Sequence, residues 1–152
     1  MNCKALLIAI ALLTALSAGC AKKTADEHAG HTDASPPHYQ DGVYTAQSSP
    51  DERGAVGQIT VTVQSGKITQ AEYKGVQKDG RIKDDDYGKT SGKVENKDFY
   101  DKAQKAVKGG QTYAPKLVEA QDPEKVDSVT GATVSYRQFV EAAKKALGQA
   151  KK

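Results

Sequence analysis

A threonine hydroxyl precedes the last amphipathic segment of the chain, in a position suited to carrying a phosphate. Ser135 and Gln138 form a capping-box pattern, which predicts that a helix begins at Ser135. Thr133 would then lie just before the first turn, where free backbone N–H groups and the helix dipole favour an anion such as a phosphodiester. The helix itself is predicted by five apolar residues at i, i+3, i+4, i+7 and i+11: Tyr136, Phe139, Val140, Ala143 and Leu147.

Small and polar residues surround this threonine in residues 127–135, which read D-S-V-T-G-A-T-V-S. Gly131 is expected to make a tight turn, and Gly131 and Ala132 should leave room for an enzyme to reach the hydroxyl. Asp127 is expected to shape the turn or to orient the hydroxyl. The simpler alternative is a loop that ends in an ordinary helix cap, because Thr, Gly and Ser are common at such positions.

The same stretch resembles the flavin attachment motif of FMN-binding domains, D-x-x-[ST]-G-A-T. Such a domain occurs in the C subunit of sodium-translocating NADH:quinone reductases and in the G subunit of Rnf-type electron transport complexes. In that family the last threonine of the motif carries FMN through a phosphoester. The resemblance therefore implies covalent FMN on Thr133, with Asp127, Thr130, Gly131 and Ala132 as the other cofactor-binding residues.

Short alternating segments predict an antiparallel sheet in the first part of the domain. The expected strands are residues 42–46, 59–64 and 67–73. Ser65 and Gly66 form a turn, and such short connections favour a meander. The D-G-V-Y opening and the G-K-I hairpin again resemble the FMN-binding domain. The resemblance covers about residues 41–147 and implies an α+β fold, a small antiparallel β-sheet packed with helices.

Two helices are expected between the sheet and the motif. The first covers residues 98–108, and Gly109 and Gly110 would end it. The second covers residues 114–120, and Pro123 would break the chain before the motif.

A charged, glycine-rich stretch at residues 79–89 predicts a long surface loop. Its three consecutive aspartates lack the alternating ligands of a calcium loop, so a solvated acidic turn is favoured. Tyr87 belongs to a D-Y-G-K stretch that resembles small flavin lipoproteins, and its ring is a candidate to stack on the isoalloxazine. The alternative is a tyrosine packed under its own loop.

Residues 1–19 predict a bacterial lipoprotein signal peptide. Residues 16–20, L-S-A-G-C, resemble a lipobox, so Cys20 is the expected lipidation site, with palmitate among its acyl chains. The apolar run is shorter than the ~20 residues that span a bilayer, which disfavours a retained membrane helix. Cys3 would leave with the signal, so a covalent cofactor would have to use oxygen or nitrogen chemistry rather than a thiol.

The mature chain is expected to have a tether and one domain. Residues 20–40 contain the anchor cysteine and a flexible polar tether, and residues 41–149 form the FMN-binding domain. The only histidines, His28, His31 and His38, fall in the tether, and a polar linker is favoured over a metal site.

Charge and composition narrow the function. The net charge is only +3, and acidic and basic residues are interspersed, so nucleic acid is not an expected partner. No His, acid and nucleophile constellation points to a hydrolase. The resemblance implies an electron carrier in the cell envelope, not an enzyme. Its expected partners are a flavin transferase that uses FAD, a membrane redox donor and an extracytoplasmic acceptor. The open alternatives are a non-redox surface lipoprotein and a noncovalent FMN binder.

Overall fold

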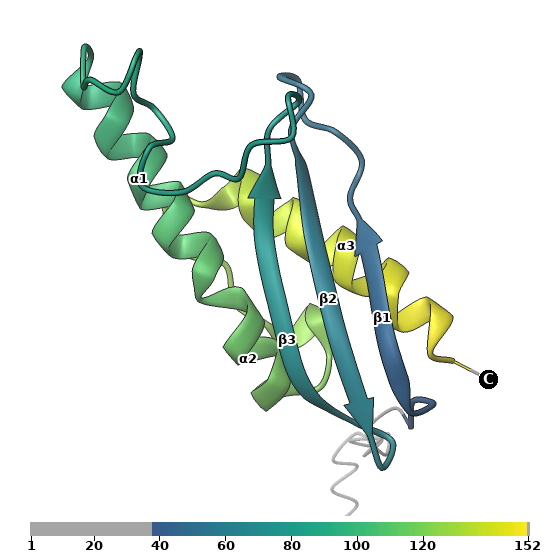
Figure 1. Cartoon of the computed structure of the whole chain (residues 1–152). Helices are drawn as coiled ribbons and strands as arrows, with labels where there is room; N and C mark the ends of the chain where they lie inside the picture. Colours follow the sequence, from purple (N-terminus) through teal and green to yellow (C-terminus); the bar gives the residue numbers. More distant parts are fainter. Residues whose placement is uncertain (1–37, 152) are drawn as a thin grey trace, which may run out of the picture. The chain divides into compact units, whose positions relative to one another are not determined.

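The computed structural model describes residues 38–151, which form a three-stranded sheet with helices packed on one face (Figure 1). The elements are β1 (Gly42–Gln47), β2 (Val56–Gln64), β3 (Lys67–Val76), α1 (Lys97–Gln111), α2 (Tyr113–Ala120), a 3₁₀ turn η1 (Pro123–Lys125) and α3 (Thr133–Gln149). The predicted α+β fold class is confirmed.

The sheet is the predicted antiparallel meander, with strand order β1-β2-β3. Its middle strand alternates buried Ile59, Val61 and Val63 with half-buried polar residues, because successive side chains of a strand point to opposite faces. Ser65 and Gly66 both have positive φ, 53° and 75°, as a two-residue type I′ hairpin requires.

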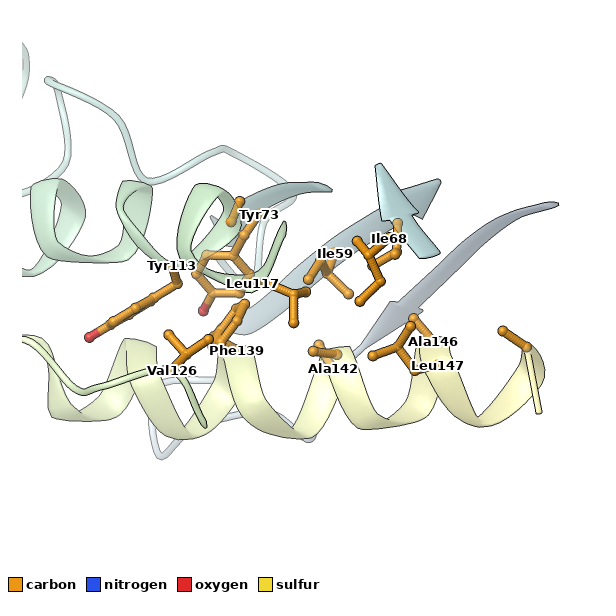
Figure 2. Close-up of a cluster of buried hydrophobic side chains, with 14 of the residues drawn as sticks. Ile59, Ile68, Tyr73, Tyr113, Leu117, Val126, Phe139, Ala142, Ala146 and Leu147 are labelled. Atoms are coloured by element: carbon orange, nitrogen blue, oxygen red, sulfur yellow. The ribbon is translucent and has the colours of Figure 1, made fainter. Parts of the chain in front are cut away.

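The core lies between the sheet and helices α2 and α3 (Figure 2). Helix α3 crosses the inner face of β1 and β2, and α2 packs on β3. Phe139 of α3 is completely buried, with its ring centroid 5.4 Å from Tyr73 and 5.1 Å from Tyr113. Burial of such a side chain is worth about 1.5–3 kcal/mol, so this aromatic cluster fixes α3 on the sheet. The predicted stripe of α3 is confirmed at its buried members, Phe139, Ala143 and Leu147.

Helix α1 does not end at Gly109 and Gly110 as predicted, but continues through both to Gln111. A Cβ placed on Gly109 would lie 2.6 Å from the Cβ of Ala132, so glycine is needed here for the close approach of another segment. The helix ends at Thr112, whose hydroxyl donates to the carbonyl of Gly109 (2.7 Å).

The predicted start of the last helix was also wrong, because α3 begins at Thr133 and Ser135 lies inside its first turn. The N-cap is Ala132, and no side chain caps the helix. Gln138, the expected capping-box partner, is buried and donates instead to the carbonyl of Ala55 (2.7 Å). Because a buried carbonyl must be hydrogen-bonded, Gln138 donates to Ala55 and is not available to cap the helix.

Two residues that the sequence placed in the tether pack against the domain. Tyr39 is 3 % exposed, and its N–H donates to the carbonyl of Gly66 (3.2 Å). The N–H of Gln40 donates to the carbonyl of Ala150 (2.7 Å), which joins the chain to the far end of α3.

The signal peptide, Cys20, His28 and His31 lie outside the described residues. Within residues 38–151, no helix combines the length and the apolar character needed to cross a membrane.

Candidate functional site

A cleft of about 830 Å³ opens between the β1–β2 loop, the end of β3 and the loop after it, one side of α1 and the first half of α3. The apolar part of its wall includes Tyr73, Ile82, Tyr87, Phe99, Ala103 and Val134. Ile82, Phe99 and Val134 are 47 %, 39 % and 44 % exposed, so the cleft presents apolar surface that the domain itself does not cover. Volume and lining match a site for a small aromatic molecule.

The predicted site threonine begins α3 beside this cleft. Thr133 is exposed, and the next two residues, Val134 and Ser135, line the cleft. Because no side chain caps α3, the N–H groups of its first turn are free to meet an anion.

The loop before Thr133 is held by a tyrosine that the sequence analysis missed. The hydroxyl of Tyr113 accepts from the N–H of Val129 (3.2 Å) and donates to the carbonyl of Ala132 (3.3 Å). Burial raises the pKa of this hydroxyl, although the N–H of Val129 opposes the shift, so the group stays protonated and able to donate. Tyr113 thus binds both ends of the turn formed by residues 129–132.

The other predicted motif residues differ in their surroundings. Gly131 has a φ of +87°, which confirms the tight turn. Ala132 is 1 % exposed and packs against α1 at Gly109, so the expectation that it leaves room for access was wrong. Asp127 and Thr130 are exposed, and within residues 38–151 the side chain of Asp127 makes no hydrogen bond, so neither role predicted for it has a visible partner.

Tyr87 is half-buried and lines the cleft from the loop after β3. The Nζ atom of Lys83 lies 5.2 Å from its ring centroid, and Gln104 holds its backbone by donating to the Tyr87 carbonyl (2.8 Å). Stacking of this ring on a flavin stays a prediction. The neighbouring Asp84, Asp85 and Asp86 are exposed, and in the part of the chain that is described no three metal-binding side chains gather at one point.

The β1–β2 loop forms the opposite wall, and the sequence analysis gave it no role. Glu141 of α3 accepts from both the N–H (2.9 Å) and the hydroxyl (2.6 Å) of Ser49, and also from Lys145 (2.8 Å). The hydrogen bond from Lys145 and those from Ser49 lower the pKa of Glu141 to about 2.

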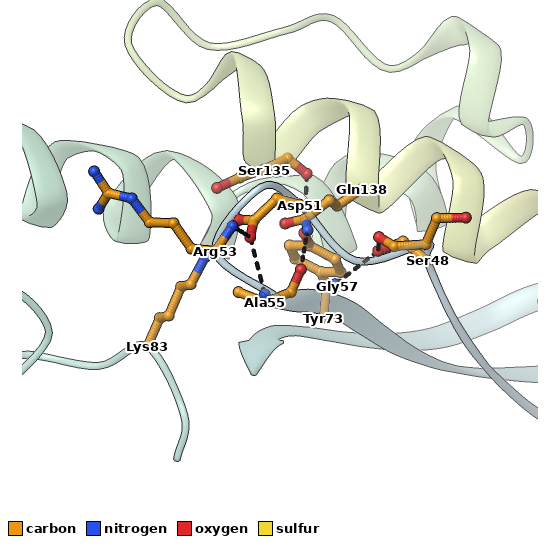
Figure 3. Close-up of polar contacts among 10 residues, drawn as sticks. Ser48, Asp51, Arg53, Ala55, Gly57, Tyr73, Lys83, Ser135 and Gln138 are labelled. Carbon is orange, nitrogen blue, oxygen red and sulfur yellow. Dashed lines mark hydrogen bonds and ion pairs between the residues drawn. The ribbon is translucent and has the colours of Figure 1, made fainter. Parts of the chain in front are cut away.

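Inside the loop, the Oδ1 atom of Asp51 accepts from the N–H groups of Arg53 (3.0 Å) and Ala55 (2.9 Å), as Figure 3 shows. In the sequence, the turn-forming residues P-D-E-R-G indicate a loop at this position. They do not indicate that Glu141 of α3 binds this loop.

Comparison with known proteins places this geometry in a family. The chain matches the FMN-binding domain over residues 54–148. It also resembles the crystal structure of the CPE2226 protein from Clostridium perfringens, with 28 % identity over 74 % of this chain and 88 % of that one, at a TM-score of 0.53. A protein from Clostridium thermocellum solved by NMR is 28 % identical over 74 % of this chain and 92 % of that one, at a TM-score of 0.43. None of the curated proteins matches the chain.

The matched region contains the sheet from β2 onward, α1, the motif loop and nearly all of α3, and so includes the walls of the cleft except the part of the β1–β2 loop that precedes residue 54. The chain belongs to the FMN-binding domain family, and its cofactor is FMN.

Proposed function

We propose that this chain is a flavin carrier that holds FMN covalently on the hydroxyl of Thr133 and exchanges electrons outside the cytoplasm. The observation that carries the proposal is the exposed threonine at the uncapped start of α3, beside a cleft of about 830 Å³ whose wall combines apolar and charged side chains. A phosphate on this hydroxyl would meet free N–H groups, and the attached ring would have an apolar wall to cover.

The residues present fit this cofactor. Val134 and Ser135 connect the threonine to the cleft wall, and Tyr87 and Phe99 offer aromatic rings to a planar group. The side chain of Lys105, from α1, packs against Gly131 of the motif turn, where an added Cβ would lie only 3.0 Å from it. When bound, FMN would supply the redox chemistry, and the protein would supply attachment, exposure and nearby charge.

Attachment requires a second protein. A flavin transferase would pass FMN from FAD to Thr133: the threonine oxygen forms a bond to the FMN phosphorus, the pyrophosphate bond breaks, AMP leaves and the hydroxyl proton is released. The exposure of Thr133 leaves the hydroxyl accessible to such an enzyme.

The carrier role and the location complete the proposal. We infer a lipid anchor on Cys20, after removal of residues 1–19, and exchange with a membrane donor and an extracytoplasmic acceptor. Covalent attachment suits such a compartment, because released FMN would be lost by dilution. The support is the sequence L-S-A-G-C and the polar stretch that follows it.

The test is co-expression of the full chain with a flavin transferase, followed by mass spectrometry after denaturation. The wild-type chain should be yellow and heavier by one FMN, and Thr133→Val should gain no mass. Ser128→Ala is the matched control, since it removes another exposed hydroxyl of the same loop at a position that the motif leaves open, and it should still be loaded. Equal loading of Thr133→Val would refute the site. Colour that is lost on denaturation would instead indicate a noncovalent FMN binder, and a colourless chain a non-redox lipoprotein.

A further inference from the structure

One ion pair lies in the wall of the cleft, partly shielded from solvent. The Nζ atom of Lys83 is 3.5 Å from Oδ2 of Asp51, and both residues line the cleft. The side chains are 14 % and 18 % exposed, which makes this the most buried of the six ion pairs in the described residues. Charges in such a place are screened less than surface charges and act more strongly on a neighbouring molecule.

The two oxygens of Asp51 have separate roles. Oδ1 accepts from the N–H groups of Arg53 and Ala55 and so holds the loop, while Oδ2 faces Lys83 (Figure 3). Burial opposes ionisation, but these hydrogen bonds and the charge of Lys83 outweigh it and lower the pKa of Asp51. An asparagine would keep the loop-holding oxygen and lose the charge, together with the oxygen that accepts from Lys83.

Lys83 is held in place along its whole length. Its N–H donates to the carbonyl of Gly75 (2.8 Å), and its methylenes cover that glycine, where a Cβ would lie 3.0 Å from the lysine Cδ. Its ammonium group lies 5.2 Å from the ring centroid of Tyr87. The position of this positive charge at the cleft wall is therefore fixed by three neighbours.

We propose that Lys83, opposed by Asp51, sets the reduction potential of a flavin in this cleft. The inference rests on the function proposed above. Two electrons and one proton added to the neutral isoalloxazine leave the ring with one negative charge. A fixed ammonium in the wall stabilises this charged ring more than the neutral one, and the carboxylate beside it offsets part of that effect.

The test is the midpoint potential of the flavin-loaded full chain, measured by dithionite titration against a reference dye. Lys83→Met should weaken the preference for the reduced ring about tenfold, which corresponds to a potential about 30 mV lower for a two-electron couple. Asp51→Asn should raise the potential by a similar amount, and Lys83→Arg should leave it near the wild-type value. Lys144→Met is the matched control, because Lys144 also forms an ion pair, with Glu124, but does not line the cleft.

The opposite signs separate an electrostatic role from a structural one. Loaded Lys83→Met and Asp51→Asn proteins with unchanged potentials, or with shifts in the same direction, would overturn the inference while leaving the proposed function intact. If Lys83→Met does not fold, the loop-preserving Asp51→Asn variant decides alone by the presence or absence of its upward shift. A wild-type chain that takes up no flavin would overturn both proposals.

Discussion

Replacing Gly109 with alanine should destabilise the domain, even though alanine favours helices. Inside a helix, alanine is better than glycine by about 0.8–1.0 kcal/mol. At Gly109, however, the new methyl would lie 2.6 Å from the Cβ of Ala132 and 3.3 Å from Cγ1 of Val129. Real Cβ atoms essentially never approach this closely, so we take the upper part of the usual overpacking cost, about 2–3 kcal/mol. Less the helix gain, the net loss is about 1–2 kcal/mol, which lowers the melting temperature by about 5–10 °C.

Urea and thermal denaturation followed by circular dichroism would measure this loss, since the chain has no tryptophan. Gly148→Ala is the matched control, because Gly148 also lies in a helix but a Cβ there meets nothing within 4 Å. It should be neutral or stabilising by up to about 1 kcal/mol.

A second substitution tests the cause. Adding Ala132→Gly to Gly109→Ala removes the opposing methyl, so the double variant should be more stable than the sum of the single effects, by about 1–2 kcal/mol. If Gly109→Ala is as stable as Gly148→Ala, or if the two sites behave additively, the close approach of α1 to the motif is not what requires glycine.

Two further predictions concern the motif loop before Thr133 and the β1–β2 wall of the cleft. Tyr113→Phe should destabilise the domain by about 1–2 kcal/mol, because the N–H of Val129 and the carbonyl of Ala132 lose their common partner, and it should slow flavin loading of Thr133; unchanged denaturation and loading would contradict this. Glu141→Gln should reduce stability most above pH 4.5, because the folded pKa of Glu141 is lowered from 4.5 to about 2 and its contribution is lost as pH falls between these values. Denaturation of both proteins at a series of pH values should show curves that converge near pH 2, and a constant difference would refute the assignment.

The elements with regular periodicity could be predicted from the sequence. The meander follows from period-two alternation and from the Ser65 and Gly66 turn, and the buried stripe of α3 follows from its helical spacing. Both patterns arise because the apolar residues of a buried face recur with the period of the element, two residues in a strand and about 3.6 in a helix.

The errors arise where a local pattern competes with a distant contact. Gln138 looks like a capping-box residue, but its partner, Ala55, is 83 positions away in the sequence. Gly109 looks like a helix end, but Ala132 of the motif turn is what requires it. The cleft shows the same limit, because its β1–β2 wall is held by Glu141 through contacts that no local pattern indicates.

The hydrogen bond between Gln40 and Ala150 places the beginning of the described chain at one end of the domain. It attaches the incoming chain near the last residue of α3, whereas Thr133 is the first residue of that helix. A helix of 17 residues is about 25 Å long, so the Gln40–Ala150 contact and the exposed hydroxyl of Thr133 lie at opposite ends of one helix. A partner bound at the cleft would therefore leave the Gln40–Ala150 contact uncovered.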